Sequence, residues 1–178
     1  ADIALARELA DQARGRARIV ALSVDADEAQ IDRNSAEVRP DIHHLHGSET
    51  VARSRAIATR TGVDVMKVIK VREAAETTAA QAYVAPAGPC QMVLFDAKAP
   101  PGAILPGGNG LAFDWRHLEG VPETVPYMLS GGLTPENVID AIRLTRARAV
   151  DVSSGVERAP GEKDPGRIRA FIAAAKSL

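Results

Sequence analysis

The sequence is poor in cysteine and in aromatic residues, and it has no long apolar run. One cysteine among 178 residues excludes a disulfide framework and a cysteine-based zinc cluster, and it is typical of a reducing compartment. Aromatic residues make up 3% of the chain, so Ala, Val, Ile and Leu must build the core. No apolar segment approaches the roughly 18–20 residues of a membrane span. The first residues also lack a basic segment followed by an apolar core, so we expect no signal peptide and a cytoplasmic location.

The chain also lacks an excess of charge of either sign. The chain carries 22 Lys and Arg residues against 23 Asp and Glu residues, for a formal net charge of −1. Proteins that bind nucleic acids or anionic membranes through bulk charge need a basic field, so we expect no nucleic-acid partner and no membrane partner. Length and composition together predict one globular domain.

Helical and strand periodicities alternate along the chain. Helices are predicted over residues 1–17, 27–37, 48–61, 73–84, 134–146 and 164–176. Strands are predicted over residues 18–24, 41–45, 63–71, 91–95, 127–129 and 149–152, with a long loop at 97–112. Ser48 and Thr134 are the expected N-caps of their helices. Strands that are apolar on both faces and separated by helices indicate a parallel sheet in an α/β fold.

Two architectures fit six such strands. One is an open, doubly wound sheet. The other is a (β/α)8 TIM barrel. In that case residues 1–178 are a single barrel domain, and six of the barrel's parallel strands are represented here. A typical barrel has about 250 residues, so the chain is short for one.

Two glycine-containing loops follow the last two predicted strands. Gly131 and Gly132 stand between a strand and a helix, where free backbone N–H groups and the helix dipole favour an anion such as phosphate. Ser154 and Gly155 follow the next strand and offer similar groups. Either loop alone is also compatible with a plain turn, but the pair matches the barrel phosphate site after the last two strands.

Asp96 comes directly after the predicted apolar strand 91–95. A carboxyl group at the carboxyl end of a buried strand faces the site of an α/β fold and can serve as a general acid. A turn-forming aspartate that bonds its own backbone is the alternative. Lys98 lies two residues on and can pair with Asp96 or remain solvated.

Histidines cluster at positions 43, 44 and 46. Strand alternation places His44 and His46 on one face, which is an acceptable spacing for metal ligands. No third ligand is evident nearby, so we expect no metal and interpret these residues as strand-end and pocket histidines. Cys90 precedes its predicted strand, at the end opposite Asp96, and is not expected to be catalytic.

Several motifs in order resemble the phosphoribosylanthranilate isomerase family. They are Leu45-His46-Gly47, Leu94-Phe95-Asp96-Ala97-Lys98, Pro106-Gly107-Gly108-Asn109-Gly110 with Phe113-Asp114-Trp115, Ser130-Gly131-Gly132-Leu133-Thr134-Pro135-Glu136-Asn137, Asp151-Val152-Ser153-Ser154-Gly155-Val156-Glu157 and Pro160-Gly161-Glu162-Lys163-Asp164. The resemblance covers essentially the whole chain.

The resemblance implies a TIM barrel of tryptophan biosynthesis that needs no metal or cofactor. The implied reaction is the Amadori rearrangement of N-(5-phosphoribosyl)anthranilate to 1-(2-carboxyphenylamino)-1-deoxyribulose 5-phosphate. Asp96 matches the general acid, Gly131, Gly132, Ser154 and Gly155 match the phosphate loops, and Asp151 and His44 match substrate-binding positions. The implied partner is a phosphoribosyl small molecule, and the oligomeric state, monomer or homodimer, stays open.

The sequence also departs from the family pattern. The family's general base is a cysteine in a Lys-Ile-Cys-Gly-like motif, and an arginine receives the anthranilate carboxylate. Neither has a counterpart here, so we expect the first two β/α units to be missing from the sequence and the 178-residue chain alone to be inactive. His44 stands where the family usually has glutamine.

The alternative to an active isomerase is a non-catalytic phosphosugar-binding remnant. A nucleotide-binding domain is disfavoured because no G-x-G-x-x-G motif or P-loop follows the strand at 18–24.

Overall fold

The computed structural model describes residues 2–84, 86, 88–97 and 114–178. The helices are α1 (Ile3–Ala13), α2 (Glu28–Arg33), α3 (Val51–Thr61), α4 (Ala80–Tyr83), α5 (Val138–Thr145) and α6 (Pro165–Ala175). The strands are β1 (Val20–Ser23), β2 (Ile42–Leu45), β3 (Asp64–Val71), β4 (Cys90–Ala97), β5 (Tyr127–Leu129), β6 (Ala149–Val150), β7 (Glu157–Ala159) and β8 (Glu162–Lys163). Lys98 and the glycine-rich motif that begins at Pro106 lie outside the described residues, apart from its end at Asp114 and Trp115.

The strands form a sheet in sequential order from β1 to β6. The pairs β1–β2, β2–β3, β4–β5 and β5–β6 are parallel. This arrangement confirms the predicted α/β fold with parallel strands. The antiparallel pair β7–β8 was not predicted, because both strands are short and polar and lie between the predicted strand at 149–152 and the predicted helix at 164–176.

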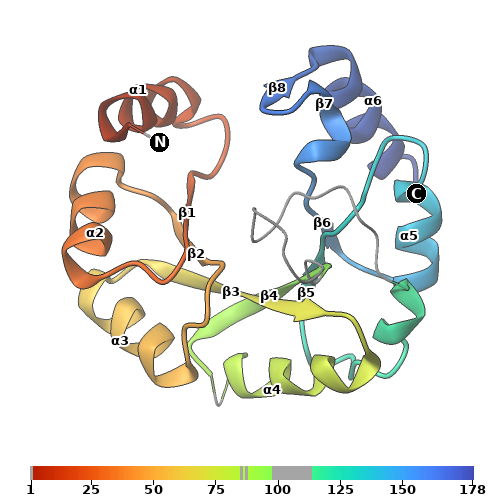
Figure 1. Ribbon diagram of the computed structural model, residues 1–178, viewed down its shortest axis with the longest axis horizontal. Helices are drawn as coiled ribbons and strands as arrows, with labels where there is room; N and C mark the ends of the chain where they lie inside the picture. Colours follow the sequence, from red (N-terminus) through yellow and green to blue (C-terminus); the bar gives the residue numbers. More distant parts are fainter. Residues whose placement is uncertain (1, 85, 87, 98–113) are drawn as a thin grey trace. The chain divides into compact units, whose positions relative to one another are not determined.

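The described chain divides into two compact units. Unit 1 comprises residues 1–68 and 81–92, and unit 2 comprises residues 69–80 and 93–178. In unit 1, helices α2 and α3 lie along one side of strands β1 and β2 (Figure 1). The main apolar cluster of unit 1 contains Ala26, Ile31, Leu45, Ile57, Val65 and Cys90. A second cluster packs Ala10 of α1 against Ile19 and Val38.

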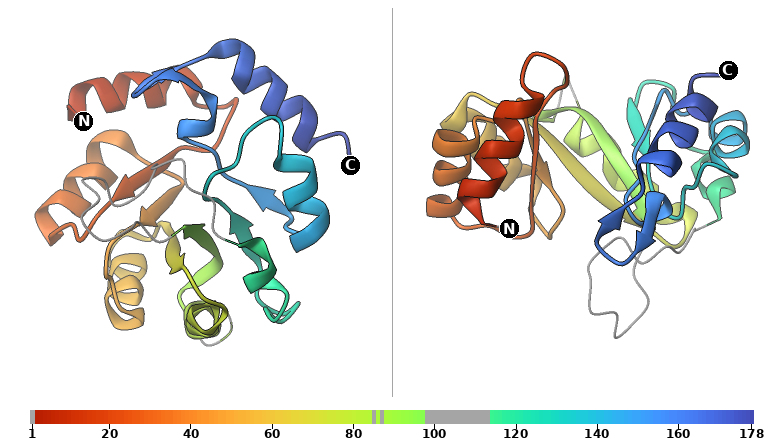
Figure 2. Two further views of the ribbon diagram at one scale, coloured as in Figure 1. Left: turned by 45° about the vertical axis from the view of Figure 1, so that its right-hand side comes forward. Right: turned by 90° about the horizontal axis from the view of Figure 1, so that it is seen from above.

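In unit 2, helices α5 and α6 lie beside each other and follow strands β5 and β6 along the chain (Figure 2). The buried side chains come mainly from β4, β5 and the start of α5: Val93, Leu94, Phe95, Leu129, Leu133, Val138 and Ala141. The rings of Phe95 and Tyr127 meet edge to face with centroids 5.2 Å apart, an arrangement that suits the aromatic quadrupole. Apolar residues of two predicted strands, together with Leu133 and the start of α5, therefore form this core.

Two predicted N-caps are wrong. Helix α3 begins at Val51, and its N-cap is Thr50, whose hydroxyl accepts a hydrogen bond from the Arg53 amide. Ser48 instead donates its hydroxyl to Asp25. Helix α5 begins at Val138 rather than after Thr134. A tertiary hydrogen bond to Asp25 holds Ser48 away from the cap position. Thr134 lies in a turn that precedes the first residue of α5.

Other boundaries also moved. The predicted helix at 27–37 is α2 followed by a π-helical segment, Asn34–Val38, and the predicted helix at 73–84 is largely a 3₁₀ segment, Ala74–Ala79, before α4. Strand β4 is longer than predicted and includes Cys90 at its start and Asp96 near its end. Asp96 is therefore part of its strand, and Cys90 opens the strand rather than preceding it.

Candidate functional site

Asp96 is a buried carboxylate near the carboxyl end of β4. Its side chain is 8% exposed, and its Oδ2 lies 2.8 Å from the Nζ of Lys70 on β3. Its Oδ1 accepts a hydrogen bond from the Ala97 amide at 2.9 Å. An ammonium and an amide thus hold the two oxygens of one carboxylate. The backbone bond to Ala97 is the local bond expected of the turn-forming alternative, whereas burial and the ion pair are what a site residue would have.

Gly131 brings the loop after β5 against Asp96. It adopts a left-handed φ of +86°. A Cβ at this position would lie 2.7 Å from the Ala97 amide nitrogen and 3.3 Å from Asp96 Oδ1. Both the conformation and the close approach require glycine. The structure therefore places the predicted anion loop and the predicted acid side by side within unit 2.

Asn137 shapes that loop from its far end. Its Oδ1 accepts a hydrogen bond from the Thr134 amide at 2.8 Å, and its Nδ2 donates to the Gly132 carbonyl at 3.0 Å. Gly132 has a φ of +69°. The amide side chain therefore joins the middle and the end of the segment 131–134 and fixes how its backbone is presented.

The loop after β6 contains the other two predicted phosphate residues. Ser154 and Gly155 belong to a one-turn 3₁₀ segment, Ser154–Val156. The Gly155 carbonyl accepts a hydrogen bond from Nε of Arg167 on α6 at 3.1 Å, and the same guanidinium contacts Glu136 at 3.2 Å. Arg167 thus connects the loop after β6 to the turn that precedes α5.

Asp151 lies directly after β6 and is held by Ser130, which directly follows β5. The Ser130 hydroxyl donates to Asp151 Oδ2 at 2.9 Å, and the Asp151 amide donates to the Leu129 carbonyl at 2.8 Å. Of the site residues predicted from sequence, unit 2 contains Asp96, Gly131, Gly132, Asp151, Ser154 and Gly155.

The predicted substrate-binding residue His44 lies in unit 1, where it is buried on β2. Its ring is 5.3 Å from that of His46, centroid to centroid. His43 points elsewhere and bonds Ser35 through Nε2 at 2.9 Å; burial lowers its pKa below the usual value and favours the neutral ring. Within the described residues, no group of three or more His, Cys, Asp or Glu side chains could hold a metal ion.

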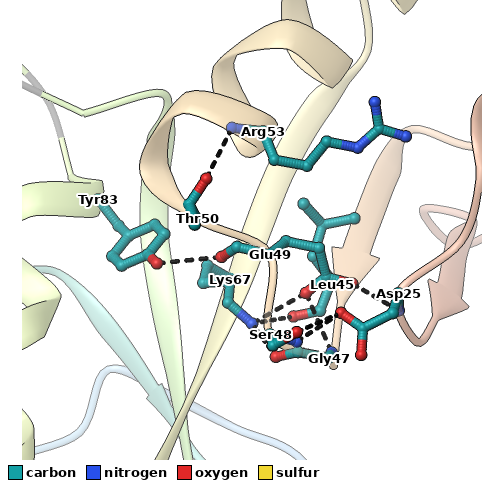
Figure 3. A network of polar contacts seen from close by, with 9 residues as sticks. All are labelled: Asp25, Leu45, Gly47, Ser48, Glu49, Thr50, Arg53, Lys67 and Tyr83. Atoms are coloured by element: carbon teal, nitrogen blue, oxygen red, sulfur yellow. Dashed lines mark hydrogen bonds and ion pairs between the residues drawn. The ribbon is translucent and has the colours of Figure 1, made fainter.

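A buried ion pair in unit 1 was not predicted from the sequence. Lys67 and Glu49 are 3.0 Å apart, with side chains 4% and 3% exposed. The Lys67 ammonium also donates to the carbonyls of Leu45 and Gly47 at 3.2 and 2.6 Å. Figure 3 shows the ammonium enclosed by these oxygen atoms. All its donor positions are used, as a buried charge requires.

The same network holds the ends of β1 and β2. Glu49 accepts hydrogen bonds from the amides of Asp25 and Gly47, at 2.9 and 3.0 Å. Asp25, with a φ of +48°, accepts from the hydroxyl and amide of Ser48, and these bonds hold the pKa of its carboxyl below the usual value. A Cβ on Gly47 would come within 2.5 Å of the Asp25 carboxyl. Tyr83 closes the network by donating to the Glu49 carbonyl (Figure 3).

Cys90 lies in the core of unit 1. It is 1% exposed, and burial raises the pKa of its thiol to about 11. Reactive cysteines are partly exposed and have lowered pKa values, so this environment is that of a structural cysteine. No helix among the described residues is long and apolar enough to cross a bilayer.

Four residues of these hydrogen-bond networks were not predicted from the sequence: Lys70, Lys67, Glu49 and Asn137. The available signal was two lysines inside the most β-branched strand of the chain, where each charge needs a partner. For Asn137 the signal was weaker, since an asparagine before a helix is ordinarily a cap.

Comparison with known proteins identifies the family of this chain. Residues 4–174 match the family model of N-(5'phosphoribosyl)anthranilate (PRA) isomerase. The chain belongs to this family. An N-(5'-phosphoribosyl)anthranilate isomerase of Rhodopseudomonas palustris (strain BisA53) is 51% identical over 176 residues, which are 99% of this chain and 79% of the relative. The family resemblance seen in the sequence motifs is thus confirmed.

Solved structures of phosphoribosyl anthranilate isomerases are similar to this chain in fold. The phosphoribosyl anthranilate isomerase of Thermotoga maritima is 33% identical to this chain and superposes with a TM-score of 0.83. The match covers 97% of this chain and 80% of the Thermotoga chain. A second structure is a phosphoribosyl anthranilate isomerase in complex with reduced 1-(o-carboxyphenylamino)-1-deoxyribulose 5-phosphate. It is 31% identical, covers 100% of this chain and 81% of its own, and has a TM-score of 0.82.

Proposed function

We propose that the protein catalyses the Amadori rearrangement of N-(5'-phosphoribosyl)anthranilate to 1-(o-carboxyphenylamino)-1-deoxyribulose 5-phosphate, a step of tryptophan biosynthesis. One observation carries the proposal: Gly131 sets an anion-type loop directly against the buried carboxylate of Asp96. A phosphorylated sugar and a proton donor can then meet at one place. Membership of the isomerase family supports the same reaction.

Asp96 is the general acid in this proposal. As its O–H bond breaks, a new O–H bond forms on the ribose ring oxygen, and the ring C–O bond opens to leave a Schiff base. The electron pair of the broken O–H bond stays on Asp96, which becomes a carboxylate. A second proton, the one bonded to C2', must later be removed by a base for the ketone to form, and we assign that base to no residue of this chain.

The phosphate site consists of Gly131, Gly132, Ser154 and Gly155. Their backbone N–H groups bind the 5'-phosphate, as free amides in glycine-rich loops at helix ends commonly do. Left-handed φ values at Gly131 and Gly132, and the Asn137 and Arg167 hydrogen bonds to the loop backbones, support a preformed site.

Asp151 and His44 contact the rest of the substrate in this proposal. The Ser130 hydroxyl orients the Asp151 carboxylate at the carboxyl end of β6, and a carboxylate in this position can accept a hydrogen bond from a substrate hydroxyl. For His44 the support is its match to a substrate-binding position of the family. Replacing His44 with the glutamine usual at that position tests the assignment, since a His44→Gln variant should keep turnover if the ring acts as a hydrogen-bond partner.

At the level of architecture, residues 1–178 belong to one (β/α)8 barrel domain in this proposal. The sequential parallel strand order and the family's structures support it. The protein acts as a monomer or a homodimer in the cytoplasm, on a small phosphoribosyl molecule.

The decisive experiment replaces Asp96 with Asn in the product of the natural gene. The shape of the side chain is kept but the proton is lost, and general acid catalysis is worth about 10²–10⁴-fold. We therefore expect kcat to fall by that factor. Asp140→Asn is the matched control, because Asp140 is an exposed carboxylate on α5.

The opposite result is equally clear. If the Asp96→Asn variant turns over within threefold of the parent at saturating substrate, Asp96 is not the acid. If the parent binds the reduced product analogue but never rearranges the substrate, the protein is a non-catalytic phosphosugar-binding member of its family.

A further inference from the structure

Strand β3 carries two lysines with different partners. Lys67 and Lys70 are three residues apart, so strand alternation directs them to opposite faces. Lys67 is occupied in unit 1 by Glu49 and two carbonyls. Lys70 belongs to unit 2, where its ammonium contacts Asp96 at 2.8 Å. The mechanism proposed above gives Lys70 no task.

The carboxylate of Asp96 is constrained on three sides. Lys70 Nζ contacts Oδ2 at 2.8 Å, and the Ala97 amide contacts Oδ1 at 2.9 Å. Gly131 lies close enough that an added Cβ would be 3.3 Å from Oδ1. The Ala97 and Gly131 constraints come from the backbone. The Lys70 contact comes from a side chain, which can be changed without altering the path of the chain.

We propose that Lys70 is a positioning residue for Asp96. This inference rests on the proposed role of Asp96 as general acid. The ammonium fixes the plane of the carboxyl group, and it faces the negative charge that remains on Asp96 after the proton has moved to the ring oxygen. Charge-assisted hydrogen bonds are short and strongly oriented, and small errors in the placement of a reacting group can cost about 10²-fold in rate.

A neighbouring cation has a second, opposing effect, because it favours the ionised form of a carboxyl group. Removing Lys70 would therefore change both the orientation of Asp96 and the pH range in which it carries a proton. The two effects separate when kcat is read at each variant's own pH optimum, where a change in protonation alone does not register as a loss.

The test compares Lys70→Met with Lys70→Arg in the product of the natural gene. We expect Lys70→Met to lower kcat at its optimum by roughly 10- to 100-fold, with KM changed less than twofold. Lys70→Arg should recover at least half of the parent kcat, because a guanidinium also pairs with carboxylate. Lys176→Met, at the exposed end of α6, controls for the loss of one positive charge.

A double variant shows whether Lys70 acts through Asp96. If it does, adding Lys70→Met to Asp96→Asn should lower kcat by less than twofold beyond Asp96→Asn alone. Independent, multiplying losses would overturn the inference. So would a Lys70→Met variant with near-parent kcat at its optimum, or an arginine variant no better than the methionine variant. Full activity in Asp96→Asn would instead refute the proposed function.

Discussion

Gly155 lies so close to the Leu133 carbonyl that a Cβ added to the glycine would be 1.8 Å from that oxygen. The loops after β5 and β6 are therefore in backbone contact. No rotamer can relieve such a contact, because both partners are main chain. The two proposed phosphate loops can approach this closely only because Gly155 has no Cβ atom.

Replacing Gly155 with Ala should force these loops apart. We expect a loss of about 1–3 kcal/mol in the free energy of unfolding, in the range of overpacking substitutions, together with weaker binding of the reduced product analogue. Urea unfolding and calorimetric titration measure the two effects. Gly120→Ala is the control, since nothing lies within 4 Å of a Cβ there; equal effects for both variants would contradict the prediction.

Gly132→Val should act on phosphate recognition. A side chain at Gly132 blocks the approach of phosphate to the backbone amides, so a phosphorylated product analogue should lose much more affinity than its dephosphorylated form. Gly62→Val is a matched control, because Gly62 has nearly the same φ, +68° against +69°, and lies at the end of α3. Equal losses for the two ligands would indicate general misfolding.

Lys67→Met should destabilise unit 1. It leaves Glu49 buried without its cation, and breaking a buried pair typically costs about 3–5 kcal/mol. Arg18→Met breaks an exposed pair with Asp64 and should cost less than about 1 kcal/mol. Denaturant unfolding compares the two. The double variant Lys67→Met, Glu49→Gln should recover part of the stability, and a double variant less stable than Lys67→Met would argue against the pair.

Cys90 should make the protein less stable at high pH. Burial raises the folded-state pKa of its thiol from the ordinary value of about 9 to about 11, so between these values the unfolded chain loses the thiol proton and the folded chain keeps it. Ionisation then favours the unfolded state, and stability falls as pH rises through this range. Below about pH 9 the group contributes no slope. Cys90→Ala should flatten the decline in unfolding free energy, and an unchanged slope would refute the assignment.

The sequence predicted the alternation of elements well because buried strands leave a strong signal. Val65 to Val71 is β-branched and apolar enough to be a strand by itself, and Gly62 ends α3 in the left-handed conformation that is typical of glycine after a helix. Errors occurred where side chains act at a distance. Ser48 was expected to cap its helix, yet it bonds Asp25, 23 residues earlier.

The candidate site was predicted in part for a similar reason. Asp96 and the glycine loops stand at strand ends, which sequence alone identifies. Lys70 could not be assigned, because a lysine on a strand gives no indication of which carboxylate lies across from it. That information is in the pairing of β3 with β4, which local patterns do not encode.

Asn137 lies outside the segment whose shape it fixes, and this matters for protein engineering. Its side chain holds both the Gly132 carbonyl and the Thr134 amide. A glycine loop transplanted into another scaffold as residues 130–134 would leave behind the group that folds it. The smallest portable unit runs to Asn137 and includes the first turn that leads into α5.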